Sequence, residues 1–151
     1  MKQLTQEPLG PMFHFGTATL YVYDSSDEDS MTALLDFLHH ENANWKIDYR
    51  TLCGFQGYDP CIENGRRFGS YENKFHIFIN LAASENSDLL NDVLPHELTH
   101  LVFCLSKYLR LPLDKSEPAA MILGNLNKKW RPLVKNEIEA WKLNKMQNNN
   151  L

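Results

Sequence analysis

Residues 74 to 105 read KFHIFINLAASENSDLLNDVLPHELTHLVFCL, and this stretch has the clearest strand pattern in the chain, followed by a helical pattern. Its first eight residues alternate with the period of two that marks a β-strand. One side of the strand carries Phe75, Ile77, Ile79 and Leu81, and the other carries Lys74, His76, Phe78 and Asn80. Cap candidates at residues 84 to 87 precede apolar residues at helical spacing up to about Leu109. The stretch therefore predicts a strand followed by a long helix, which Pro95 either kinks or effectively starts.

The residues before this unit predict two further strands and one helix. Residues 17 to 23 are rich in β-forming side chains, and residues 45 to 52 are a plausible second strand. Residues 24 to 26 supply caps for an amphipathic helix that extends to about Asn42 and has an acidic first turn. Residues 54 to 69 have no clear period, so we expect a long loop there.

The remaining segments complete one domain. A further helix is expected from about Ser116, with Gly124 or Pro132 dividing the helical material. We expect residues 1 to 15 to be an irregular lead-in and residues 146 to 151 to be a disordered tail. A length of 151 residues and an ordinary composition favour a single α+β domain, in which a small mixed sheet packs on helices.

The charge and composition of the chain argue against a nucleic-acid-binding protein and against a membrane-spanning one. The 15 Lys and Arg against 19 Asp and Glu give a net charge of −4, which argues against an electrostatic grip of the whole molecule on nucleic acid. Basic residues gather near the C-terminus around Trp130 and Trp141, but both tryptophans are expected to be core residues. The chain has no apolar segment of membrane-spanning length, and its three cysteines suggest no disulfide framework. We therefore expect a cytoplasmic protein and rank nucleic-acid binding last.

The predicted helix carries the motif His96-Glu97-Leu98-Thr99-His100. Residues four apart lie on one face of a helix, so His96 and His100 can present two imidazoles to one tetrahedral zinc ion. Glu97 lies about 100 degrees round the helix from His96, which lets its carboxylate reach a water without binding the metal. Zinc lowers the pKa of a bound water to about 7, and a carboxylate in this place serves as the general base for hydrolysis.

A catalytic zinc usually takes three protein ligands, so a third ligand is needed. Glu117 is our first choice, because it follows the turn at residues 111 to 113 and would begin the next helix. Asp114 and His76 are the alternatives. Glu117 also suits a helix N-terminus through the dipole alone, which would need no metal.

His96-Glu97-x-x-His100 followed by Glu117 resembles the gluzincin branch of zinc metallopeptidases. The closest likeness is to compact members, namely minimal gluzincins, ImmA/IrrE-type domains and zincin-like proteins encoded by bacteriophages. The resemblance covers about residues 74 to 126 and implies a zincin-like domain. It also implies that His96, His100 and Glu117 bind zinc and that Glu97 is the general base.

Two features depart from the pattern of these families. Pro118 directly follows the proposed third ligand, where the ImmA/IrrE-type pattern is acidic or small. The Tyr or His that gluzincins use to stabilise the oxyanion has no clear counterpart among His76, Tyr71 and Arg131.

Zinc-dependent hydrolysis of a peptide bond is therefore the expected function, with a peptide or protein as substrate. The resemblance to zincins also implies that the strand of residues 74 to 81 offers a sheet edge to an extended peptide. The alternative is a catalytically silent zincin-like binding or accessory protein, such as a phage-encoded one, with a structural zinc site. A Glu97→Gln variant separates the two, because only the enzyme needs the carboxylate.

Overall fold

The computed structural model describes most of the chain, namely residues 1–9, 16–40, 52, 54–59, 62–63, 66–67, 74–109 and 117–150. The described strands are β1 (Lys2–Pro8), β2 (Thr17–Tyr23), β3 (Gly54–Asp59), β4 (Ile62–Glu63), β5 (Arg66–Arg67) and β6 (Lys74–Asn80). The α-helices are α1 (Glu28–His40), α2 (Leu94–Leu109) and α3 (Glu117–Asn149). A 3-10 helix, η2 (Leu81–Glu85), and a π-helical turn, η3 (Leu89–Val93), join β6 to α2. The α+β class expected from the sequence is confirmed.

Strand β6 lies inside the main sheet, whose order is β1-β2-β6-β3. It pairs in parallel with β2, from Thr17 opposite Lys74 to Tyr23 opposite Asn80, and antiparallel with β3. The prediction that residues 74 to 81 form a sheet edge is therefore wrong, because both sides of β6 already hydrogen-bond to neighbours. The expectation of a loop over residues 54 to 69 is also wrong at Gly54–Asp59, which pair with β6 as β3.

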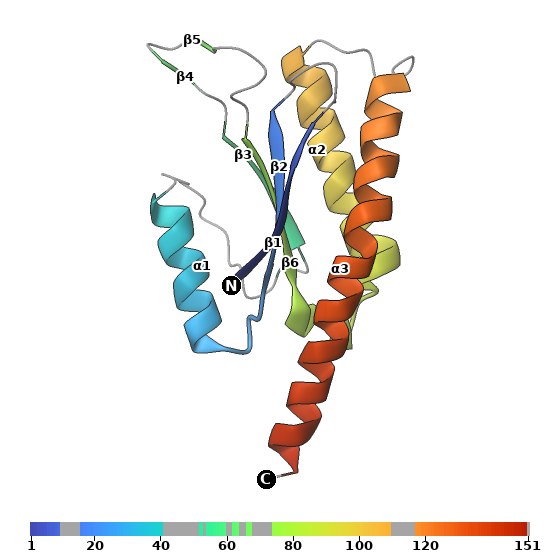
Figure 1. Ribbon diagram of the computed structural model, residues 1–151. Helices are drawn as coiled ribbons and strands as arrows, with labels where there is room; N and C mark the ends of the chain where they lie inside the picture. Colours follow the sequence, from blue (N-terminus) through green and yellow to red (C-terminus); the bar gives the residue numbers. More distant parts are fainter. Residues whose placement is uncertain are drawn as a thin grey trace.

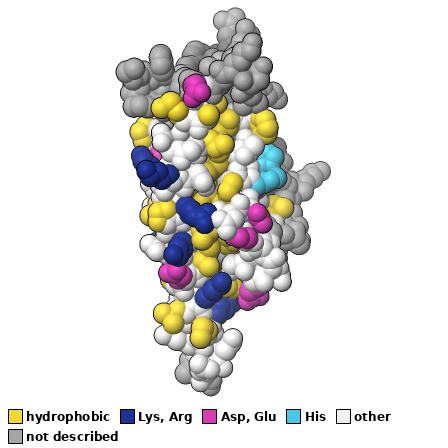
Figure 2. All heavy atoms as spheres, turned by 90° about the vertical axis from the view of Figure 1, so that its right-hand side faces the viewer, with side chains coloured by type: hydrophobic (Ala, Val, Ile, Leu, Met, Phe, Trp, Pro, Cys, Tyr) yellow, Lys and Arg dark blue, Asp and Glu magenta, His cyan; other side chains and the backbone are white. Residues whose placement is uncertain are grey.

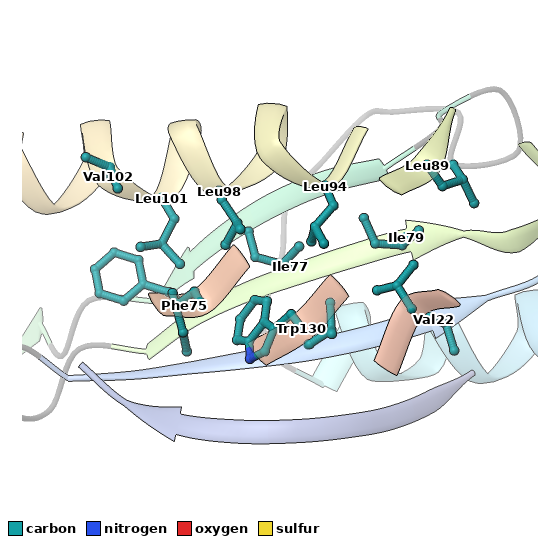
Figure 3. Packing of buried hydrophobic residues seen from close by; sticks show 14 of the residues in the cluster. Val22, Phe75, Ile77, Ile79, Leu89, Leu94, Leu98, Leu101, Val102 and Trp130 are labelled. Atoms are coloured by element: carbon teal, nitrogen blue, oxygen red, sulfur yellow. The ribbon is translucent and has the colours of Figure 1, made fainter. Parts of the chain in front are cut away.

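The alternation read from β6 divides its side chains between two cores. Phe75, Ile77 and Ile79 are fully buried in the cluster formed with α2 and α3 (Figure 3). Phe78 points to the other face, where its ring lies 4.8 Å from that of Tyr21 in a cluster with α1. Figure 1 shows the resulting layers, with α1 on one side of the sheet and α2 and α3 on the other.

Helix α2 begins close to the proline, as predicted, but the cap before it is Asp88 and not one of the predicted residues 84 to 87. The Asp88 carboxylate accepts hydrogen bonds from the backbone N–H groups of Leu90 and Asn91, which opens the π-helical turn before α2. Pro95 is the second residue of α2 and directly follows the π-helical turn, so it lies at the junction of the two helical segments. The prediction that Pro95 marks the effective start of the helix is confirmed.

Helix α3 is one continuous helix, in contrast to the predicted division at Gly124 or Pro132 and the predicted disordered tail from residue 146. Trp130 and Val134 flank Pro132 and are fully buried, so packing against the sheet holds both sides of the proline in place. Near the C-terminus, the Trp141 indole N–H donates a 2.7 Å hydrogen bond to the Asp24 carboxylate. The prediction that Trp130 and Trp141 are core residues is confirmed, since both belong to the buried cluster.

The N-terminus also differs from expectation, because Lys2–Pro8 form edge strand β1 instead of an irregular lead-in. This strand pairs antiparallel with β2 and is tied to α3 by ion pairs of Lys2 with Glu137 and of Lys129 with Glu7. Pairing across the sheet thus overrides the turn-forming residues of the segment. The predicted strand at residues 45 to 52 lies outside the described residues apart from Leu52.

Among the helices that the structure describes, none combines the length and the hydrophobicity that crossing a membrane requires.

Candidate metal and catalytic site

His96 and His100 lie on the solvent-exposed face of α2 with their rings in contact. Their Nε2 atoms are 3.0 Å apart, and the ring centroids are 4.7 Å apart at an interplanar angle of 83°. Two nitrogens bound to one tetrahedral zinc at about 2.0 to 2.1 Å would be separated by about 3.3 Å. The two Nε2 atoms therefore lie within hydrogen-bonding distance of each other, at a separation close to that of two ligands of one zinc ion. Figure 2 shows histidine side chains at the surface on the side of the molecule covered by α2 and α3.

Glu97 occupies the neighbouring position on α2 but is only 6% exposed. Desolvation by burial raises the pKa of its carboxyl group above the ordinary value, and the charge of His96 lowers it by less. Burial therefore makes this carboxylate a better proton acceptor than one in water. A perturbed carboxyl group beside two converging imidazoles is typical of a catalytic site.

Strand β3 lies close to α2 at Gly54. A Cβ atom at this position would lie 2.9 Å from the Phe78 carbonyl oxygen, 2.9 Å from Val93 Cγ1 and 3.3 Å from Glu97 Cγ. The absence of a side chain thus lets the edge strand lie against the Glu97 side chain. Gly54 was not predicted as part of the site, although an isolated glycine in a strand pattern suggests a close backbone approach.

Gly54→Ala is expected to destabilise the protein by about 1 to 3 kcal/mol, because the new methyl group meets a backbone oxygen that cannot move cheaply. Urea unfolding of the metal-free protein measures this change. Gly124→Ala is the matched control, since a Cβ there meets nothing within 4 Å and alanine favours the helix. Equal stability of Gly54→Ala and wild type would show that β3 is not held against Glu97.

The raised pKa of Glu97 makes the stability of the metal-free protein depend on pH. Burial disfavours the ionised form, so the destabilisation is absent below the ordinary pKa of 4.5 and grows as pH rises through the higher folded value. Glu97→Gln is therefore expected to be more stable than wild type at pH 8, by a margin that disappears near pH 4. Urea unfolding of both proteins between pH 4 and pH 8, in the presence of a chelator, measures this difference in stability. A margin that does not change with pH would contradict the raised pKa.

The third ligand expected from the sequence is not gathered with the histidine pair. Glu117 is the exposed first residue of α3, and within the described residues no three His, Cys, Asp or Glu side chains form a group able to hold a metal. Asp114 lies outside the described residues. The described part of the site therefore consists of His96, His100 and Glu97.

His76 does not belong to this site. It alternates with Phe75 and Ile77 along β6 and so faces α1, where its Nδ1 lies 3.4 Å from the Tyr21 hydroxyl and its ring contacts Phe37. The sheet separates it from α2, so its proposed roles as third ligand or oxyanion partner are wrong. Of the other two oxyanion candidates, Arg131 donates a hydrogen bond to the carbonyl oxygen of Leu90 in η3, and Tyr71 lies outside the described residues.

No protein family model, no curated protein and no solved structure matches this chain.

Proposed function

We propose that this protein is a zincin-like, zinc-dependent metallopeptidase whose site is built on α2. One observation carries the proposal: two exposed imidazole Nε2 atoms converge to 3.0 Å beside a buried carboxyl group with a raised pKa. The spacing of the motif, the resemblance to gluzincins and the packing of β3 against Glu97 support the same assignment. Each part has a distinct chemical task.

The donor set suits zinc, which binds imidazole nitrogen readily. His96 and His100 would hold the ion through Nε2, the two atoms that face each other in the structure. When bound, zinc polarises a substrate carbonyl and makes a water molecule acidic enough to react near neutral pH. Glu117 is proposed as the third ligand.

Glu97 is proposed as the general base. Its carboxylate takes the proton from the attacking water, and the resulting acid can pass that proton to the departing amine. Burial supports this exchange, because a carboxyl group with a raised pKa holds the proton long enough to deliver it. The side chain is fixed between the helix and β3, so little reorganisation is needed during the reaction.

The substrate is proposed to lie along β3 instead of β6. Within the described sheet β3 pairs on one side only, with β6, and a Cβ on its first residue would lie 3.3 Å from Glu97 Cγ. An extended peptide added to this edge would run past the histidine pair with its backbone hydrogen-bonded. The edge of β3 thus takes the role that was expected for the strand of residues 74 to 81.

Metal binding is tested by measuring zinc content after chelation, repletion and gel filtration. Wild type is expected to hold about one zinc per chain, and His96→Ala or His100→Ala to hold almost none, because each removes half of the described donor set. His39→Ala, which changes an exposed histidine on α1, is the matched control. A wild-type protein without bound zinc would refute the proposal.

The same measurement on Glu117→Ala and Asp114→Ala decides the third ligand. The true ligand is expected to lower zinc affinity by about 10-fold or more when removed, and the other variant to behave as wild type. If neither variant changes affinity, the third position is filled by another residue or by water.

Binding of nucleic acid is not proposed. Trp130 and Trp141 are buried and give no surface on which bases could stack. Figure 2 shows basic side chains interspersed with acidic ones along the face covered by α3. Absence of any retardation of DNA or RNA at low salt is the expected result.

A further inference from the structure

The exposed face of α2 continues past the histidine pair to Phe103. Phe103 lies seven positions after His96, which places the two side chains about 20 degrees apart around the helix. His100 lies between them, about 60 degrees from Phe103. The three side chains therefore form one exposed stripe, whereas Leu94, Leu98 and Leu101 fill the opposite face against the core.

Phe103 is 52% exposed, which is unusual for a large aromatic side chain on a helix that packs against both a sheet and another helix. Its neighbour Val102 is buried in the core, whereas Phe103 lies on the exposed side of the same helix. The ring thus offers apolar surface to solvent, directly in line with the two histidines.

We propose that Phe103 is a specificity-determining residue that binds an apolar side chain of the peptide substrate. The proposal rests on the metallopeptidase function proposed above. A large apolar side chain beside the cleaved bond would cover the exposed Phe103 ring and remove both surfaces from water. The occupant is therefore a Leu, Met, Phe or similar side chain, and a charged residue would be disfavoured at this position.

The helix geometry also sets how far from the cleaved bond this side chain lies. Along the helix axis, the midpoint between His96 and His100 is level with position 98, five positions before Phe103, which corresponds to about 7.5 Å. An extended peptide advances about 3.3 Å per residue, so this distance equals about two residues. Phe103 is thus expected to read a side chain within two residues of the scissile bond.

Cleavage of a mixture of random synthetic peptides, identified by mass spectrometry, tests this assignment. Zinc-loaded wild type is expected to prefer large apolar residues within two positions of the cut. Phe103→Ala should cut those peptides about 10-fold or more slowly, with little change for peptides that carry alanine there. Phe103→Leu should retain the preference. Leu35→Ala is the matched control, because Leu35 is 47% exposed on α1, across the sheet from the site.

Binding gives a second readout that does not depend on turnover. A fluorescent form of the best-cut peptide should bind zinc-loaded Glu97→Gln about 10-fold more tightly than it binds the same variant carrying Phe103→Ala. If Phe103→Ala keeps the wild-type cleavage preference and the same peptide affinity, the proposed role of Phe103 is wrong. The proposed peptidase function would not be affected by that result. If zinc-loaded wild type cuts no peptide, the proposed function fails and the role of Phe103 fails with it.

Discussion

Glu97→Gln is expected to lower kcat for peptide hydrolysis by about 1,000-fold while the protein keeps its full zinc content. Glutamine has the same shape as glutamate but cannot accept a proton from water, and loss of a general base typically costs about 10²- to 10⁴-fold in rate. The side chain is buried and held against β3, so the neutral amide should remain in the same place. Steady-state hydrolysis of a fluorogenic peptide, with zinc measured on the same sample, gives both quantities.

Glu139→Gln is the control for this substitution, because it makes the same chemical change at an exposed position of α3. It is expected to leave kcat and zinc content unchanged. If wild type binds zinc but Glu97→Gln loses no function, the alternative reading holds, in which a zincin-like protein acts by binding and its metal is structural. Removal of zinc should then lower both the melting temperature and the affinity for the partner.

Trp130→Ala is expected to destabilise the fold by about 3 to 5 kcal/mol, a large share of the total stability of a domain of this size. Trp130 is fully buried between α3 and the sheet, where it lies among the side chains of Phe75 and Ile77 (Figure 3). Truncation to alanine removes most of this packing and leaves a cavity. Urea unfolding of the metal-free protein gives the change, which separates the effect on the core from any effect on the metal.

Trp130→Phe sharpens the same test. The Trp130 indole N–H is buried and finds no hydrogen-bond acceptor among the described residues, so phenylalanine removes an unpaired donor along with part of the ring. We expect a cost of only about 1 kcal/mol. Met121→Ala, at an exposed position of α3, should change stability by less than about 0.5 kcal/mol. A Trp130→Ala protein as stable as wild type would show that α3 is not packed on the sheet through this residue.

The local features of the fold could be predicted from the sequence. The period of two in β6 correctly assigned Phe75 and Phe78 to opposite faces, because that period depends only on neighbouring residues. The start of α2 was predictable in part, since Pro95 acts on the backbone within one turn, whereas the cap is Asp88 and not a residue from 84 to 87. Helix α1 likewise followed from its acidic first turn, although the backbone N–H of Ser30 is capped by Asp27 and not by a residue from 24 to 26.

The errors concern features that depend on distant residues. Pro132 does not break α3 because Trp130 and Val134 anchor both sides of it, a stabilisation that helix propensity does not include. The N-terminal segment becomes β1 because β2 offers it a partner, and Gly54–Asp59 become β3 because β6 does. Strand pairing is a contact between remote parts of the chain, so the local pattern could not reveal it.

Some features of the candidate site likewise depend on local spacing, and others depend on contacts between distant residues. The shared face of His96 and His100 on α2 follows from their spacing, because four residues correspond to about one turn of a helix. Three features could be known only from the packed fold: Glu97 is buried beside Gly54, His76 faces the opposite layer, and Glu117 is not gathered with the histidines. Burial and convergence arise when separate elements pack, and packing depends on the whole chain.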